Sequence, residues 1–357
     1  MGIKALSGIL LVFIATSEAY NANRRSILSG GAAAVFTSSN AVAAATPSIN
    51  TKQPVLVLGA NGGTGQACVR ALLARSIPCV AATRTGELSE DLKARLLTEF
   101  PPRALRDDDR GGYPILRTTA VDVTSSTSLE AAICGEKLKC RGVIFAASAS
   151  TKGGDARAVD DNGVAETAKA CIKGGVERYV VVSSGAVTRP DSAVYKLLEF
   201  AGKGIMSAKI SGEDKVRQLY ASNPAAASKG LGYTIVRPGG LTNEPPVGPA
   251  ALELNQGDDK SGRLSREDVA ALCVESLDNS AAFDATFECY NANTAKPVQS
   301  VGISNLMKST DGTAYVSGRE CRGNDWQSLL DGLSRDSEPA EHRSRRIGSS
   351  SKDIPSP

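Results

Sequence analysis

Four glycines lie within seven positions of the stretch VLVLGANGGTGQACVRAL, which runs from residue 55 to residue 72. The apolar run before Gly59 predicts a buried strand, and the pattern after Gly65 predicts a helix. Glycine loses more conformational freedom on folding than any other residue, so its repeated use indicates a need for bare backbone. A strand, a glycine turn and a helix N-terminus together can bind the pyrophosphate of a dinucleotide.

Three of the glycines have distinct expected roles in such a loop. We expect Gly59 to make the tight turn, Gly62 to let the backbone approach the pyrophosphate, and Gly65 to let the helix pack closely on the sheet. Gly63 has no role beyond being a small residue at the helix start. The loop residues Asn61 and Thr64 are further cofactor-binding candidates. The alternative is a tight turn that binds no ligand.

The end of the next predicted strand bears on the choice of nucleotide. NAD-binding proteins place an acidic residue there to hold the ribose 2′-hydroxyl group. This strand ends VAATRTG, with Arg84 and no acid. A guanidinium group suits a 2′-phosphate, so we predict NADP(H) rather than NAD(H) as the cofactor. The alternative is that Arg84 is a solvated charge at a strand end.

The composition excludes several other kinds of chemistry. His342 is the one histidine in 357 residues, which argues against Ser-His-Asp catalysis, Cys-His catalysis and most zinc sites, and we predict no metal site. The formal net charge is only +3, so we expect no nucleic-acid partner. No CxxC motif occurs among the eight cysteines. The nearest pair, Cys134 and Cys140, forms either a disulfide or two separate thiols.

Alternating strand and helix patterns follow the glycine loop. The predicted strands are continuous aliphatic runs, which favours an α/β fold with a doubly wound parallel sheet, the NAD(P)-binding Rossmann fold. Two stretches break the alternation, 188–230, which is mostly helical, and 240–320, which is mixed. We assign these small insertions to the substrate side, beyond the carboxyl ends of the strands. The expected domain is 49–322, and 323–357 is a mostly disordered tail.

Residues 1–48 are predicted to be a bipartite targeting leader. Residues 1–19 have a lysine, a short apolar run and small residues at a cleavage site, as in a signal peptide. Residues 20–45 are basic and contain twin arginines, which is typical of a transit or twin-arginine-like signal. This combination indicates a complex plastid, with the thylakoid lumen as a finer prediction; the alternative is secretion. We expect no membrane span in the mature chain.

Several motifs beyond the glycines resemble the atypical short-chain dehydrogenase/reductase superfamily, in its NmrA-like, NAD(P)-binding branch. VLVLGANGGTG, VDVTSSTSLEAAICG, RYVVVSSGAV, YTIVRPGGL and LSREDVAALCVESL match its strands, loops and a late helix over about residues 53–310. The resemblance implies a set of cofactor contacts beyond the loop, which are Asp122, Val123, Ala147, Ser148 and Lys209. It also implies a plastid-type member, because plastids contain import-complex, flavin-reductase-like and photosystem-assembly proteins of this branch.

One expected element of that superfamily is missing. Its active members use a Tyr-xxx-Lys pair, in which the lysine lowers the pKa of the tyrosine. Tyr195 has Glu199 four positions later, and Lys209 has Ile205 four positions earlier. The remaining catalytic candidates are Ser184, Tyr195 and Lys209.

Two functional hypotheses therefore stay open. The first is an oxidoreductase that reduces a small flavin- or quinone-like acceptor without a Tyr-Lys pair. The second is a non-catalytic NADP(H)-dependent redox sensor, or an assembly factor for photosynthetic complexes with a plastid protein partner.

Overall fold

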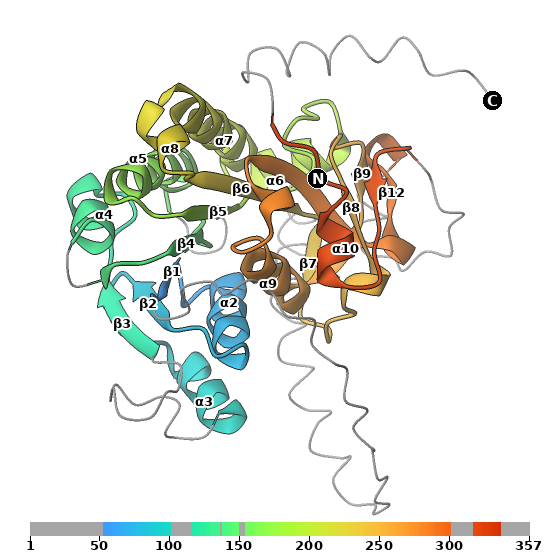
Figure 1. Ribbon diagram of the computed structural model, residues 1–357. Coiled ribbons are helices and arrows are strands. Elements are labelled where there is room, and N and C mark those ends of the chain that lie inside the picture. The colour runs from blue at the N-terminus through green and yellow to red at the C-terminus, as the bar shows by residue number, and fades with distance from the viewer. Residues whose placement is uncertain (1–52, 101–115, 136–137, 150–153, 301–316, 337–357) are drawn as a thin grey trace, which may run out of the picture. The chain divides into compact units, whose positions relative to one another are not determined.

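The computed structural model describes residues 53–100, 116–135, 138–149, 154–300 and 317–336 (Figure 1). The predicted leader at 1–48, with its segments 1–19 and 20–45, lies outside the described residues, as does the end of the chain from 337 to 357. Predictions that fall on those segments remain predictions.

A nine-stranded sheet forms the centre of the described chain, in the order β13-β8-β11-β6-β5-β4-β1-β2-β3. The expected doubly wound sheet is confirmed, because seven of its strands pair in parallel in the order of a Rossmann fold. These strands are β1 (Val55–Leu58), β2 (Cys79–Thr83), β3 (Leu116–Ala120), β4 (Gly142–Phe145), β5 (Arg178–Val182), β6 (Gly232–Pro238) and β11 (Ala285–Asn291).

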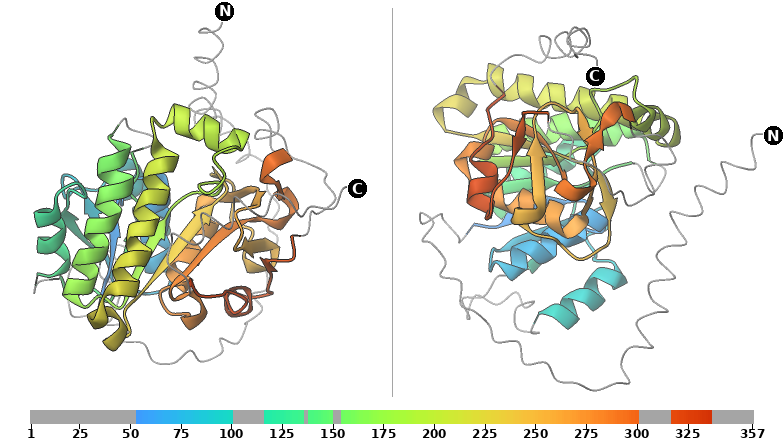
Figure 2. Two further views of the ribbon diagram at one scale, coloured as in Figure 1. Left: turned by 90° about the horizontal axis from the view of Figure 1, so that it is seen from above. Right: turned by 90° about the vertical axis from the view of Figure 1, so that its right-hand side faces the viewer.

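Helices cover both faces of this sheet (Figures 1 and 2). One face packs against α2 (Gly63–Ala74), α3 (Glu90–Glu99), α9 (Arg266–Glu275) and α10 (Trp326–Leu330). The other face packs against α4 (Ser126–Ile133), α5 (Val164–Gly174), α7 (Ile205–Ser222) and α8 (Pro224–Ser228). Alternate residues of a strand point to opposite faces, so Val55 joins the first core and Leu56 the second. Burial on both faces explains why the strands are continuously apolar.

The insertions lie where the alternation of strands and helices breaks. Stretch 188–230 forms α6 (Ala193–Ala201), α7 and α8 and is mostly helical, as predicted. The later stretch adds two small sheets, β7 (Gly240–Thr242) with β10 (Arg263–Ser265), and β9 (Lys260–Ser261) with β12 (Lys296–Pro297). A π-helical turn, η3, precedes α5 at Arg157–Gly163, and 3-10 turns occur at Pro249–Ala251, Ser280–Ala282, Ala292–Thr294 and Val298–Ser300.

Two antiparallel strands at one edge of the sheet were not anticipated. Strand β8 (Leu252–Asn255) pairs with β11, and β13 (Glu320–Cys321) pairs with β8. Buried Lys260 bonds Glu253 of β8 at 2.5 Å and Glu320 of β13 at 2.9 Å. The folded chain also continues past residue 322, where we expected the domain to end, because Leu329 and Leu330 of α10 are fully buried.

All eight cysteines lie in the described residues as free thiols, so Cys134 and Cys140 form no disulfide. None of the helices that the structure describes has the length and apolar character needed to cross a membrane.

Candidate functional site

The glycine loop joins β1 to α2 at the carboxyl edge of the sheet. Gly59 has a φ of +82°, and a Cβ atom there would lie 2.7 Å from the backbone N and Cα of Ala147, just after β4. A Cβ atom on Gly65 would lie 2.1 Å from the carbonyl oxygen of Gly59. Both positions therefore exclude a side chain, since the turn, the helix and the end of β4 approach one another closely.

The start of α2 offers backbone donors to an anion. Gly62 is the N-cap residue of α2, and a Cβ atom on it would lie 3.2 Å from Gly59 O, at the near limit of van der Waals contact. Gly63, Thr64 and Gly65 occupy the first turn, where backbone N–H groups have no acceptor within the helix. This arrangement fits the pyrophosphate group of a dinucleotide, whose negative charge the helix N-terminus would stabilise.

Asn61 holds the loop in place with its side chain. Its Nδ2 donates to the carbonyl oxygen of Glu87 at 2.9 Å, and its Oδ1 accepts from the Ser89 N–H at 2.8 Å. The side chain thus ties the loop to the segment that follows β2. Asn61 acts as a positioning residue for the glycine loop, and the Thr64 side chain is buried beneath the start of α2.

Arg84 and Asp122 follow two neighbouring strands, β2 and β3, at the same edge of the sheet. Arg84 is exposed. The backbone N–H and the hydroxyl group of Thr124 donate to Asp122 Oδ1 at 2.9 and 2.7 Å, and they lower the pKa of the Asp122 carboxyl group, with a smaller effect from Arg84. Val123 comes next and is half-buried. The predicted adenosine contacts therefore share one end of the site.

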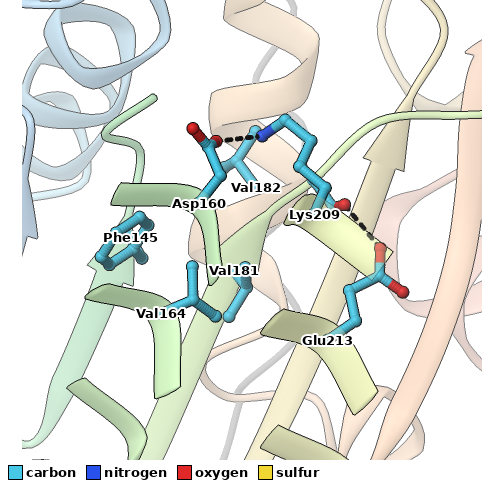
Figure 3. Close-up of a pocket in the computed structure, with 8 residues that line it drawn as sticks. Phe145, Asp160, Val164, Val181, Val182, Lys209 and Glu213 are labelled. Atoms are coloured by element: carbon cyan, nitrogen blue, oxygen red, sulfur yellow. Dashed lines mark hydrogen bonds and ion pairs between the residues drawn. The ribbon is translucent and has the colours of Figure 1, made fainter. Parts of the chain in front are cut away.

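Lys209, on the first turns of α7, pairs with a buried carboxylate that the sequence analysis did not anticipate. Its Nζ lies 2.8 Å from Asp160 Oδ1, and Figure 3 shows the two side chains meeting above the strands. Asp160 Oδ2 also accepts from the Ala149 N–H at 2.9 Å. Asp160 lies in the π-helical turn η3, a distortion often found at functional sites. It links Lys209 to the segment after β4 that contains Ala147 and Ser148.

The position where a Tyr-xxx-Lys pair would place its tyrosine, four residues before Lys209, holds an isoleucine. The side chain one turn earlier on α7 is Ile205, which is 4% exposed. Tyr195 lies on α6, where burial and the nearby Glu199 raise the pKa of its phenol. Glu199 accepts from the Met206 and Ser207 N–H groups at 2.8 and 3.1 Å, so it caps the start of α7. Tyr195 and Glu199 therefore do not reproduce a Tyr-xxx-Lys pair.

The two serines at the end of β5 have different surroundings. Ser184 donates to the carbonyl oxygen of Gly185 at 3.1 Å. Ser183 is buried and donates to Glu213 Oε1 at 2.5 Å. The predicted candidate Ser184 thus has a local backbone partner, whereas Ser183 belongs to a buried ionic network.

Glu213 is the centre of that network, which we call the Glu213 network. Its carboxylate also bonds Arg237 at 2.6 Å and Arg217 at 2.7 Å, and Arg237 continues to Glu288 at 3.0 Å. Burial opposes ionisation of Glu213, but Arg237 and Arg217, with the Ser183 hydroxyl group, lower its pKa to about 2. Spacing is the signal that could have found it, because Lys209, Glu213 and Arg217 follow one another every four residues along a helix.

A small cavity lies between Lys209 and Glu213 (Figure 3). Its volume is about 10 Å³, enough for about one water molecule. Phe145, Val164 and Val181 form its apolar wall. Among the described residues, no group of three or more His, Cys, Asp or Glu side chains is arranged to hold a metal ion.

Comparison with known proteins gives three kinds of similarity. Residues 85–280 match the model of a family described as NAD(P)H-binding. An uncharacterized chloroplastic protein of Arabidopsis thaliana is 32% identical over 240 residues, which cover 64% of this chain and 73% of that protein. The chloroplastic protein high chlorophyll fluorescence phenotype 173, also from Arabidopsis thaliana, is 40% identical over 84 residues, 24% of this chain and 12% of that protein. The oxidoreductase YlbE from Lactococcus lactis has a similar fold, with a TM-score of 0.49 and 18% identity, covering 73% of this chain and all of that one.

Proposed function

This chain belongs to the NAD(P)H-binding family, and from that premise we propose that it is an NADP(H)-dependent reductase of a small flavin- or quinone-like acceptor. When bound, the nicotinamide ring supplies or receives a hydride. The protein's own part is to bind the dinucleotide on the glycine loop and to hold its nicotinamide end near Lys209. The family match covers NAD(P)H binding; the oxidoreductase activity and the acceptor class are our proposal.

The pairing of Lys209 with Asp160 carries this proposal. A carbonyl substrate needs a proton donor beside it, which a tyrosine with a lowered pKa provides in related enzymes. Here Ile205 stands four residues before Lys209, where the resemblance implies a tyrosine, and the lysine ammonium group faces a buried carboxylate at 2.8 Å. Flavins and quinones can take their proton from solvent after hydride transfer, so they suit a site without that donor.

Arg84 supports NADP(H) over NAD(H). It is exposed at the end of β2, in the place where an acid would bind the ribose 2′-hydroxyl group. We expect Arg84→Asp to weaken NADPH binding by about tenfold and to leave NADH binding nearly unchanged. Lys229→Asp makes the same charge change at an exposed site just before β6, at the opposite edge of the sheet. Equal NADPH/NADH affinity ratios in the two variants would refute the 2′-phosphate role.

The second candidate is a non-catalytic NADP(H)-dependent redox sensor or assembly factor. It is favoured because the polar groups near Lys209 already bond buried partners: Lys209 bonds Asp160, and Ser183 bonds Glu213. A protein of this kind would bind the nucleotide and change its affinity for a protein partner without turnover.

One experiment separates the candidates. The full chain is titrated with NADPH and NADH by nucleotide fluorescence, and NADPH oxidation is then followed with flavin and quinone acceptors. Binding with acceptor-dependent oxidation supports the reductase, whereas binding without oxidation by any acceptor supports the sensor or assembly factor. Gly62→Val should abolish binding in either case, because its side chain would fill the pyrophosphate site. Unchanged affinity in Gly62→Val would contradict the assignment of the loop.

We also propose a plastid location. The two Arabidopsis relatives are named as chloroplastic, and residues 1–48 have the composition of a bipartite leader. A fluorescent fusion of residues 1–48 should enter the plastid of an alga with complex plastids. Export of that fusion to the medium would support secretion instead, and a lumenal signal would refine the location to the thylakoid.

A further inference from the structure

Arg266 lies against the one glycine of the loop that had no assigned role. It is the first residue of α9, and its side chain lies beside the start of α2. A Cβ atom on Gly63 would lie 2.8 Å from Arg266 Nε and 2.9 Å from its Cδ. Helix α2 follows β1 of the central sheet, whereas α9 follows β10 of the small sheet that β10 forms with β7. The absence of a side chain at position 63 therefore leaves room for the guanidinium group beside the glycine loop.

The bonds of this guanidinium group leave its charge without a matching anion. Its Nη1 donates to Oδ1 of Asn243, a neutral amide, at 2.6 Å. The acids that follow it in the chain are engaged elsewhere: Glu267 pairs with Arg70 at 3.2 Å, and Asp268 accepts from backbone N–H groups including that of Val247. In the ranges that the structure describes, no salt bridge involves Arg266.

Burial makes it unfavourable for the charged Arg266 guanidinium group to have no carboxylate partner. The residue is half-buried, and burial lowers the pKa of its guanidinium group. A partly desolvated cation gains most from a bound anion, and a guanidinium group can form two parallel hydrogen bonds with a phosphate. The adjacent first turn of α2 presents backbone N–H groups that also favour an anion.

We propose that Arg266 binds the pyrophosphate group of the dinucleotide, together with the backbone N–H groups at the start of α2. This inference rests on the proposed binding of NADP(H) to the glycine loop and adds a contact from α9, a helix that comes much later in the chain. It also gives Gly63 a role, because any larger residue there would displace the Arg266 side chain. The contact differs from the one proposed for Arg84, which would bind the 2′-phosphate at the adenosine end of the dinucleotide.

The test compares Arg266→Gln with Arg263→Gln in the full chain. Arg263 lies three residues earlier on β10, and its Cγ contacts Gly240 rather than the glycine loop. We expect Arg266→Gln to weaken both NADPH and NADH binding by about 10- to 100-fold, as for loss of a charged hydrogen bond. Arg263→Gln should change either affinity by less than about threefold. Adenosine 2′-monophosphate, which has no pyrophosphate, should bind to wild type and to Arg266→Gln with equal affinity.

Each other outcome decides against one of the two proposals. Unchanged dinucleotide affinity in Arg266→Gln, or an equal loss in Arg263→Gln, overturns the role of Arg266. A lower melting temperature of nucleotide-free Arg266→Gln, with weaker binding of adenosine 2′-monophosphate, assigns the residue a structural role and overturns it as well. A wild-type chain that binds neither NADPH nor NADH overturns the proposed function itself.

Discussion

Replacing Glu213 by glutamine should destabilise the protein by about 3 kcal/mol at neutral pH. Glu213 is 1% exposed, and its carboxylate bonds Ser183, Arg217 and Arg237 at distances of 2.5 to 2.7 Å. These partners lower its pKa from 4.5 to about 2 against the opposing effect of burial. Each pKa unit is worth about 1.4 kcal/mol, so the difference corresponds to about 3 kcal/mol in favour of the folded, ionised state.

The effect has a defined dependence on pH. Because the pKa of Glu213 is lower in the folded state than in the unfolded state, its contribution is present above pH 4.5 and is lost as the pH falls towards about 2. Glutamine cannot titrate, so Glu213→Gln should lack this loss. The free energies of unfolding of wild type and variant, measured by urea denaturation at several pH values from 7 to 3, should converge as the pH falls.

Glu275→Gln is the matched control for this prediction. Glu275 pairs with Arg75 at 2.9 Å, but both side chains are about a third exposed. Removing such a surface pair should change the free energy of unfolding by less than about 1 kcal/mol. A cost of Glu213→Gln as small as that of Glu275→Gln, or a difference from wild type that stays constant down to pH 3, would refute the role given to the Glu213 network.

Three further substitutions test other parts of the structure. Burial and the neighbouring Asp258 raise the pKa of Glu288 from 4.5 to about 7, so wild-type stability should fall as the pH rises through that interval. Glu288→Gln should remove this decrease in the free energy of unfolding. Profiles of that free energy for wild type and variant that run parallel from pH 5 to 8 would contradict the raised pKa of Glu288. Gly65→Ala should lower the free energy of unfolding, measured in urea, by about 1–3 kcal/mol or more, because the added Cβ would lie 2.1 Å from Gly59 O. The control Gly62→Ala, whose Cβ would lie 3.2 Å from Gly59 O, should lower it by less. Equal losses in the two variants would refute the close packing of α2. Leu330→Ala should lower the free energy of unfolding by about 2–5 kcal/mol, whereas the control Leu198→Ala, at an exposed position, should lower it by less than about 0.5 kcal/mol. A negligible loss in Leu330→Ala would argue that α10 does not pack on the sheet.

Local pattern predicted the parallel part of the fold. The runs VLVL and RYVVV form β1 and β5 because strands covered on both faces need apolar residues at every position. Each run was followed by a helical pattern, and this alternation indicates a doubly wound parallel sheet. Those signals lie within a few residues of the elements they predict.

The edge of the sheet could not be predicted in that way. Strand β8 has the sequence LELN, and both Glu253 and Asn255 are fully buried. Their burial depends on polar partners elsewhere in the chain, since Lys260 bonds Glu253 and Asp259 bonds Asn255. A short run with buried polar residues resembles a loop until those partners are known.

The residues of the candidate site also differ in whether local sequence patterns point to them. The glycine loop and Arg84 could be proposed as cofactor-binding candidates because each follows a predicted strand directly. Asp160 and Arg266 could not, because their importance depends on which distant segment they meet: Asp160 meets Lys209 of α7, and Arg266 meets Gly63 at the opposite end of the described chain. Sequence reasoning therefore proposed a site at the glycine loop but missed Asp160 and Arg266, the charged groups that distant elements bring beside it.

The place of β13 in the chain has a consequence for biosynthesis. Strand β8 is exposed along its outer edge until β13 pairs with it, and Lys260 gains its second carboxylate, that of Glu320, only from this strand. A ribosome releases residues 320–321 after every strand of the parallel sheet has already been made. The nascent chain therefore carries an open sheet edge until residues 320–321 have been made, and a chain that stops before residue 320 would be prone to edge-to-edge aggregation.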